Sequence, residues 1–359
     1  MSRRPRASGY FRTGYGQDLS LVETRAERCS LAGLLIVLLA FPFLASPFLL
    51  DLANQVLLAS IGAIALMLLT GYAGQISLGH AGLLAAGAFT AGILYKELNA
   101  PVWVTLPAAA VVGALLGLVF GLPSLRLRGL YLAVSTLALH FVVVYCGGEY
   151  EAKRGFSTGI MIDPPTLGAW TIAGGRTWYF MLAVAAVATL YVCVNLLRSG
   201  TGRAWAALRA NETVAGALGI GVAAHKLLAF VISSALTAAA GALFAYYRGF
   251  VSVEVFSLFL SIQYVAMIII GGIGSMLGAI LGAVFVTLFP YGIEAGLRAL
   301  TGTQRYAGML FAVNYAAFGA VMILVLVLEP LGLVGIWRRI QTYFLLWPFK
   351  HRPMARPHR

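Results

Sequence analysis

The chain has 359 residues, of which 60% are apolar, 41 are Gly and only 10% are charged, and its formal net charge is +13. A soluble domain has roughly 25% charged residues and cannot cover this much apolar surface, so the composition excludes a soluble fold. Three widely separated cysteines exclude a disulfide scaffold and have no metal-ligand spacing. The composition predicts an all-α polytopic integral membrane protein.

Stretches free of Asp, Glu, Lys and Arg define the predicted membrane spans, because a helix needs ~20 mostly apolar residues to cross the hydrocarbon core. The stretches are 31–50, 52–95, 98–125, 129–148, 177–197, 227–247, 255–293 and 306–328. Two of them, 52–95 and 255–293, are long enough for two helices each, so we predict ten spans. By this definition no charged residue lies inside a span, which argues against a transporter driven by protons or sodium.

The distribution of positive charge predicts the orientation. With ten spans and both termini in the cytoplasm, the cytoplasmic segments contain 18 Lys and Arg and the external segments contain seven. Five acidic residues lie in the cytoplasmic segments and seven in the external ones, so all of the net charge lies on the cytoplasmic face, as the positive-inside rule requires. We therefore expect a basic cytoplasmic N-terminal segment (1–30), a transmembrane domain (31–330) and a basic cytoplasmic tail (331–359). These basic segments flank helices, so we expect membrane lipid and no nucleic acid beside them.

Each double-length stretch has a glycine cluster near its middle, where a membrane helix can break. Broken helices expose backbone polar groups at membrane depth, and in transporters such places commonly form the solute site. We therefore predict a solute path at the two breaks, although His80 has the alternative role of a polar residue that bridges helices. The candidates are Gly71, Gly74, Gln75, Ser77, Gly79 and His80 in the first break, and Gly272, Gly274 and Ser275 in the second.

Sequence motifs for chemistry are absent. The chain has no Gly-x-x-x-x-Gly-Lys-Ser/Thr loop, no His-Glu-x-x-His and no Gly-x-Ser-x-Gly elbow. We therefore predict no enzyme, no catalytic residue, no metal site and no cofactor in this chain. The energy for transport is expected to come from another polypeptide.

The longest internal cytoplasmic loop, 198–226, has partial helical spacing of apolar residues. Asn211 is placed to cap a second short helix, with Glu212 at its positive end and Gly219 at its stop. The loop is either an amphipathic linker on the headgroups or a docking helix for a soluble motor. In the second case we expect Arg209, Glu212, Ala215 and Gly219 to couple the chain to that motor.

Several segments resemble a known family. Glu212-Thr-Val-Ala215-(x)3-Gly219 resembles, in reduced form, the Glu-Ala-Ala…Gly loop of ATP-binding-cassette importer permeases. Gly71-Tyr-Ala-Gly-Gln-Ile-Ser-Leu-Gly-His-Ala81 resembles the signature segment of branched-chain amino-acid importer permeases. Leu125–Leu137, Lys226–Ser233 and Gly271–Ala279 are similar to further markers of that family. The resemblance covers roughly residues 50–330 and best fits the larger of the two permease subunits.

The resemblance implies a multi-pass subunit of a bacterial inner-membrane importer for branched-chain or related amino acids. Its expected partners are cytoplasmic ATPase subunits that bind ATP and Mg, a second permease subunit in a heterodimer, and a periplasmic solute-binding protein. Two departures leave the solute open: Leu130 replaces a common Asp, and Leu139-His140 replaces a frequent Gly-Glu pair. A permease for urea, short amides or carbohydrates, a secondary transporter and a channel remain as alternatives.

Overall fold

The computed structural model describes residues 25–125, 129–156, 159–167, 170–301, 310–329 and 331–346. The chain divides into two compact units, Ser46–Gly335 and a smaller one that joins Met1–Ala45 to Ile336–Arg359. In the smaller unit the structure describes α2 (Arg25–Leu44) and the larger part of α14 (Gly332–Leu346). Residues 1–24 of the predicted basic N-terminal segment and residues 347–359 of the predicted basic tail lie outside the described residues.

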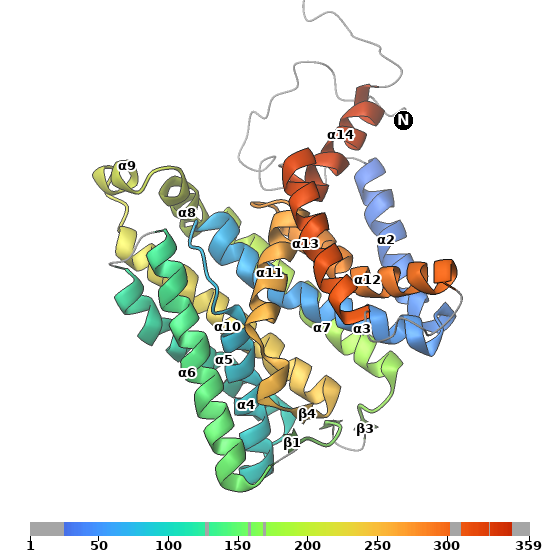
Figure 1. The fold of residues 1–359 in the computed structure, drawn as a ribbon. Coiled ribbons are helices and arrows are strands. Elements are labelled where there is room, and N and C mark those ends of the chain that lie inside the picture. Colours follow the sequence, from blue (N-terminus) through green and yellow to red (C-terminus); the bar gives the residue numbers. More distant parts are fainter. Residues whose placement is uncertain are drawn as a thin grey trace, which may run out of the picture. The chain divides into compact units, whose positions relative to one another are not determined.

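The larger unit is a bundle of helices with two short antiparallel strand pairs (Figure 1). Its helices are α3 (Pro47–Leu66), which continues as the π-helical turn η1 (Met67–Tyr72), α4 (His80–Leu98), α5 (Val102–Ser124), α6 (Leu130–Arg154), α7 (Gly175–Arg198), α8 (Gly200–Ala210), α9 (Glu212–Ala217), α10 (Val222–Arg248), the 3-10 turn η2 (Val253–Val255), α11 (Leu258–Gly271), α12 (Met276–Thr301) and α13 (Leu310–Leu328). The antiparallel pairs are β1 (Ile160–Met161) with β4 (Phe250–Val251), and β2 (Thr166–Leu167) with β3 (Trp170–Thr171).

The structure confirms an all-α polytopic membrane protein. Among the described residues, seven helices are long and apolar enough to cross a membrane. The other three predicted spans contain α4 and the shorter apolar stretches of α2 and α13. Both double-length stretches divide into two helices at their glycine clusters, α3 and α4 in the first and α11 and α12 in the second.

The boundary between the first two spans differs from the prediction. A stretch without charge was expected to end before Asp51, but the helix break lies earlier, at Ala45 and Ser46. Pro47 begins α3, and the Ser46 side chain accepts a hydrogen bond from the Leu49 N–H, so two local signals for a helix start take precedence over the charge. The expectation that spans contain no charged residue is therefore wrong for Asp51.

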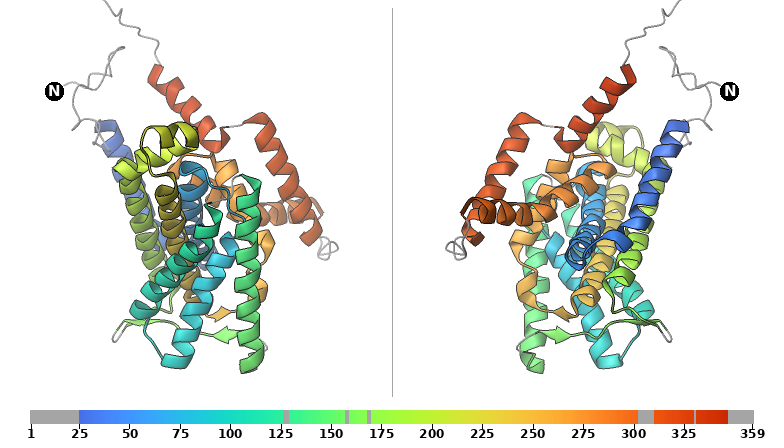
Figure 2. Two further views of the ribbon diagram at one scale, coloured as in Figure 1. Left: turned by 90° about the vertical axis from the view of Figure 1, so that its left-hand side faces the viewer. Right: turned by 90° about the vertical axis from the view of Figure 1, so that its right-hand side faces the viewer.

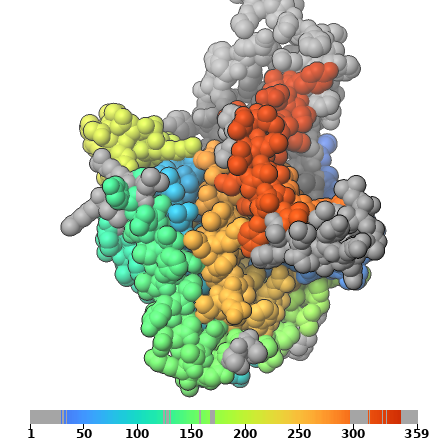
Figure 3. Space-filling model, viewed as in Figure 1, coloured from blue at the N-terminus to red at the C-terminus, as the bar shows by residue number. Residues whose placement is uncertain are grey.

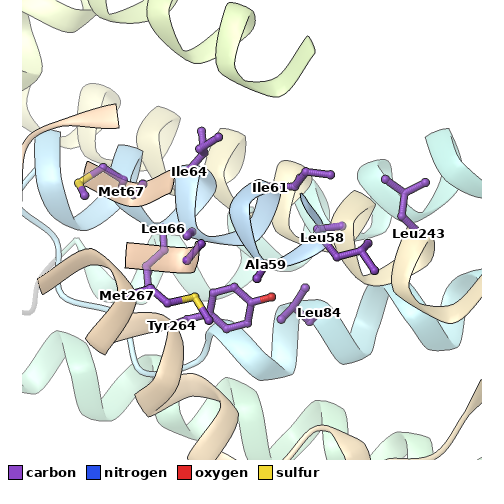
Figure 4. Packing of buried hydrophobic residues seen from close by; sticks show 14 of the residues in the cluster. Leu58, Ala59, Ile61, Ile64, Leu66, Met67, Leu84, Leu243, Tyr264 and Met267 are labelled. Atoms are coloured by element: carbon purple, nitrogen blue, oxygen red, sulfur yellow. The ribbon is translucent and has the colours of Figure 1, made fainter. Parts of the chain in front are cut away.

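Helix α3 lies at the centre of the larger unit: 78% of its span is buried, against 22% of the α7 span. Figure 4 shows Leu58 and Ala59 of α3 beside Tyr264 and Met267 of α11. Glycines let the neighbouring helices approach closely. A Cβ atom on Gly87 of α4 would collide with a backbone carbonyl of α10, so the two backbones are in direct contact at this glycine. Membrane helices commonly associate through small residues in this way, because in lipid the hydrophobic effect does not drive them together.

The larger unit has two distinct ends. Helices α8 and α9 lie at one end, and the paired strands β1 and β4 lie at the other (Figures 1 and 2). We refer to these as the loop end and the strand end. Helix α10 connects them: four residues separate its start from the end of α9, and one glycine separates its last residue, Arg248, from β4.

Candidate functional site

The first glycine break is a stretch of irregular backbone, residues 73–79, between η1 and α4. Backbone groups at membrane depth need partners, because the hydrocarbon core offers none. Side chains from other helices provide them: the Leu78 N–H donates to Thr136 Oγ1 and the Ala81 N–H donates to Ser261 Oγ, each at 2.9 Å. Helices α6 and α11 thus hold the broken backbone in place.

Gln75 ties this break to the start of α10. Its side chain is buried, and its Nε2 donates to the Lys226 carbonyl at 2.9 Å. Its own carbonyl accepts a hydrogen bond from Thr70 Oγ1 at 3.0 Å. The preceding residue, Gly74, has φ +72°, a conformation that side chains with a Cβ rarely adopt. The Gln75 side chain therefore joins the first break to the start of α10.

The second glycine break is the turn between α11 and α12. Gly272 and Gly274 have φ values of +115° and +92°, so the turn requires glycine at both positions. Ser275 has a local role, because its Oγ accepts a hydrogen bond from the Gly278 N–H at 3.3 Å and caps α12.

Arg209 brings the two breaks together. Its Nη1 donates to the Gly71 carbonyl at the end of α3. A Cβ atom on Gly274 would come within 2.7 Å of the same Nη1, and one on Gly74 would lie 3.4 Å from Arg209 Cγ. An arginine predicted for coupling and three glycines predicted for the solute path therefore form one cluster, which we call the arginine–glycine cluster.

The loop that carries Arg209 is folded against α10. Asn211 caps α9 as expected, since its Oδ1 accepts from the Thr213 and Val214 N–H groups. Trp205 of α8 is fully buried and donates from Nε1 to the His225 carbonyl at 2.8 Å. Glu212 and Lys226 form an ion pair at 2.5 Å. The loop thus consists of two ordered helices, α8 and α9.

The exposed surface of α9 differs from the prediction in one residue. Ala215 is 1% exposed and packs inside the unit, so the expectation that it faces a partner is wrong. Val214 (54% exposed) and Leu218 (75% exposed) point outward instead. Gly219 has φ +85° and nothing within 4 Å of its Cβ position, and Figure 3 shows the α8–α9 region standing out from the surface.

The remaining residues of the first break lie in the interior. Gly79 packs so closely on the Thr136 backbone that a Cβ atom would not fit. Ser77 and His80 are each 1% exposed, and Ser77 Oγ and His80 Nε2 have no hydrogen-bond partner among the described residues. The His80 ring lies against Tyr264, with 4.6 Å between ring centroids. These two buried groups would need water or a solute to complete their hydrogen bonding.

A cavity of about 320 Å³, which the sequence did not predict, lies between α3, α10, α11 and α12. Its apolar lining includes Leu58, Met267 and Val286, and the Tyr264 ring that covers His80 also forms part of the wall. Its polar lining consists of Gln55, Arg248, Gln263, Thr287 and Tyr291. The volume is at the lower end of the roughly 300–1,000 Å³ typical of small-molecule sites.

Asp51 anchors the polar wall of this cavity. It accepts a hydrogen bond from Gln55 Nε2 at 2.7 Å and another from the Tyr247 hydroxyl. The Tyr291 hydroxyl donates to Gln55 Oε1 at 3.2 Å. Sequence analysis missed this network because its members lie up to 236 residues apart; the i, i+4 spacing of Asp51 and Gln55 was the one local signal.

Comparison with known proteins gives a consistent result. Residues 48–327 match the family described as branched-chain amino acid transport system, permease component. The high-affinity branched-chain amino acid transport system permease proteins LivM of Salmonella typhimurium and Escherichia coli are 31% and 30% identical, each over 88% of this chain and 76% of the relative. The autoinducer 2 import system permease protein LsrC of an Enterobacter species is 30% identical over 51% of this chain and 54% of the LsrC chain. No solved structure matches.

Proposed function

This chain belongs to the family of permease components of branched-chain amino acid transport systems, and from that premise we propose that it forms half of the translocation path of an ATP-driven importer. In this proposal it resides in a bacterial inner membrane, pairs with a second permease subunit and carries branched-chain or related amino acids. A periplasmic solute-binding protein delivers the solute. Cytoplasmic ATPase subunits bind ATP and Mg and supply the energy.

The charge distribution supports the orientation that this proposal needs. If the loop end faces the cytoplasm, the positively charged segments fall on the cytoplasmic side, as the positive-inside rule requires. The exposed apolar side chains Val214 and Leu218 would then be available to a soluble ATPase. Val214 lies on α9 and Leu218 directly follows it, so both belong to the segment that this proposal assigns to docking.

The arginine–glycine cluster is the observation on which the mechanism depends. Arg209 lies near the end of α8, two residues before the cap of α9, and it binds the backbone where α3 ends. Movement of α8 and α9 by the ATPase subunits would therefore displace the Gly71 carbonyl and the Gly274 turn together. Since the glycine turns have no side chains to lock them, they are the places where α3 and α11 can move relative to α4 and α12.

The test is ATP-dependent uptake of labelled leucine by proteoliposomes that contain the complete importer. We expect Arg209→Gln to reduce uptake at least tenfold, because it removes a charge-assisted hydrogen bond worth about 1.5–3 kcal/mol. Arg203→Gln is the matched control, since Arg203 lies on the same helix and, among the described residues, its side chain donates a single hydrogen bond, to the Arg198 carbonyl at 3.4 Å. Uptake that is independent of ATP, or equal losses in both variants, would contradict the proposal.

A second candidate is a permease of the same family for another small solute. It is favoured by the similarity to a relative named for autoinducer 2 import. A panel of amino acids, short amides, urea and sugars, offered to the same proteoliposomes through the cognate binding protein, distinguishes the two.

A further inference from the structure

The cavity between α3, α10, α11 and α12 has two chemically different walls. Leu58, Met267 and Val286 make one part apolar, while Gln55, Arg248 and Tyr291 make another part polar. A solute that fits both must itself have an apolar part and a strongly polar part. Neither water alone nor a lipid tail uses both surfaces.

The polar wall is held in a fixed arrangement. The Gln55 amide is bound at both of its atoms, by Asp51 Oδ2 at 2.7 Å and by the Tyr291 hydroxyl at 3.2 Å. Asp51 is bound a second time by Tyr247 of α10. Three helices therefore position these groups before any solute enters, and preorganised groups bind a polar ligand without the cost of ordering them.

The polar wall also has separated charges. Arg248 lies over the face of Phe244, with its guanidinium carbon 5.8 Å from the ring centroid, and it has no carboxylate partner in the described part of the chain. The Asp51 carboxylate lies behind the cavity-lining Gln55, and the two hydrogen bonds that it accepts come from neutral donors, the Gln55 amide and the Tyr247 hydroxyl. Arg248 thus presents a positive charge at one place in the polar wall, and Asp51, behind Gln55, provides a negative charge at another.

We propose that this cavity binds one α-amino acid with an apolar side chain, oriented by its charged groups. The solute carboxylate binds Arg248, which can donate two parallel hydrogen bonds to it. The solute ammonium binds on the Gln55–Asp51 side, and the apolar side chain lies on Leu58 and Met267. This inference rests on the proposed function, and it adds the location of the site and the chemical groups that it recognises.

Tyr264 forms the floor of this site. Its ring is buried between the cavity and His80, and a Cβ atom on Gly62 of α3 would come within 2.6 Å of it. Behind it lies His80, whose Nε2 has no hydrogen-bond partner among the described residues. A solute that leaves the cavity past Tyr264 would have to displace this ring and would then meet the His80 side chain.

The experiment measures protection of the cavity by solutes. Thr287, which lines the cavity, is replaced by Cys in a chain whose three native cysteines are changed to Ala, and the complete importer is labelled with a small thiol reagent in nanodiscs. We expect saturating leucine to slow labelling at least tenfold. Leucinamide, which lacks the carboxylate, and 4-methylpentanoate, which lacks the ammonium, should protect far less.

The Arg248→Gln variant tests the carboxylate contact. We expect it to raise the leucine concentration needed for half protection at least about tenfold, which corresponds to the loss of one charge-assisted hydrogen bond, and to leave the weak protection by leucinamide unchanged. The Thr342→Cys variant, at an exposed position in α14 that belongs neither to the cavity lining nor to the coupling loop, is the control, and leucine should have no effect on its labelling.

The outcomes separate this inference from the proposed function. If leucine is imported but does not protect Cys at 287, or if leucinamide protects as well as leucine, the cavity is not the amino-acid site and the importer proposal stands. If the complete importer takes up no amino acid, the proposed function fails. Protection by leucine that depends on Arg248 supports both.

Discussion

The ion pair between Glu212 and Lys226 allows a sharp test of how the coupling loop is held. The two side chains approach to 2.5 Å, but their environments differ: the Lys226 side chain is 8% exposed and the Glu212 side chain is 32% exposed. Removing one partner of a fully buried pair costs about 3–5 kcal/mol, because it leaves an uncompensated buried charge. The cost should therefore depend on which residue is removed.

Glu212→Gln leaves Lys226 buried without its counter-charge, whereas Lys226→Met leaves Glu212 within reach of water. Because Glu212 is one-third exposed and partly screened, we expect Glu212→Gln to cost about 2 kcal/mol, less than a fully buried pair would. We expect Lys226→Met, which keeps most of the aliphatic stem, to cost at most about 1 kcal/mol. The double variant should be less destabilised than Glu212→Gln alone.

Hydrogen exchange in the complete importer measures this difference, because amides in 211–226 exchange through local opening of the loop. A loss of 2 kcal/mol corresponds to a roughly 30-fold increase in their exchange rate, and a loss of 1 kcal/mol to about fivefold. Amides in the middle of α7 serve as the internal reference. Equal rates in the two single variants, or a larger effect of Lys226→Met, would refute the reasoning from burial.

Three further predictions concern the breaks and the orientation. Ser261→Ala should lower the melting temperature of the importer by several degrees, because it leaves the Ala81 N–H without an acceptor at a cost of about 1–3 kcal/mol. An unchanged melting temperature would mean that water replaces the Ser261 hydroxyl. Gly274→Leu should abolish uptake without preventing insertion, while Gly296→Leu, at a position with open space in the following helix α12, should retain uptake. Uptake by both variants would remove the turn from the mechanism. A cysteine at Ser199 should react with an impermeant thiol reagent only from the cytoplasmic side, and labelling from outside would overturn the orientation.

Much of the fold could be predicted from local sequence. The spans follow from apolar length, and the breaks follow from glycines such as Gly74 and Gly274, whose positive φ values other residues rarely adopt. The cap of α9 follows from Asn211 before Glu212. Each of these signals lies within a few residues of the feature it determines.

The parts that could not be predicted depend on contacts between distant segments. A charge inside a span suggests a helix end, and the sequence does not indicate that Tyr247 would satisfy Asp51 from 196 residues away. The burial of Ala215 depends on how α9 packs, which its short and weakly amphipathic sequence leaves open. The cavity is formed by four helices, so its residues share no spacing in the sequence.

The central claim is that α8 and α9 couple this permease to ATP hydrolysis. Gly219 is the place to test it, because it is exposed, has open space around it and adopts φ +85°. Gly219→Ala introduces the backbone strain of a side chain at that φ value, and Gly219→Trp introduces the same strain together with bulk on the proposed docking surface.

The decisive measurement is the ATPase rate of the reconstituted importer with and without loaded solute-binding protein. We predict that Gly219→Ala keeps the stimulation by loaded binding protein and that Gly219→Trp abolishes it, with amino-acid uptake lost in parallel. Full stimulation and full uptake in the Gly219→Trp variant would contradict the claim and reduce the loop to a connection between α7 and α10.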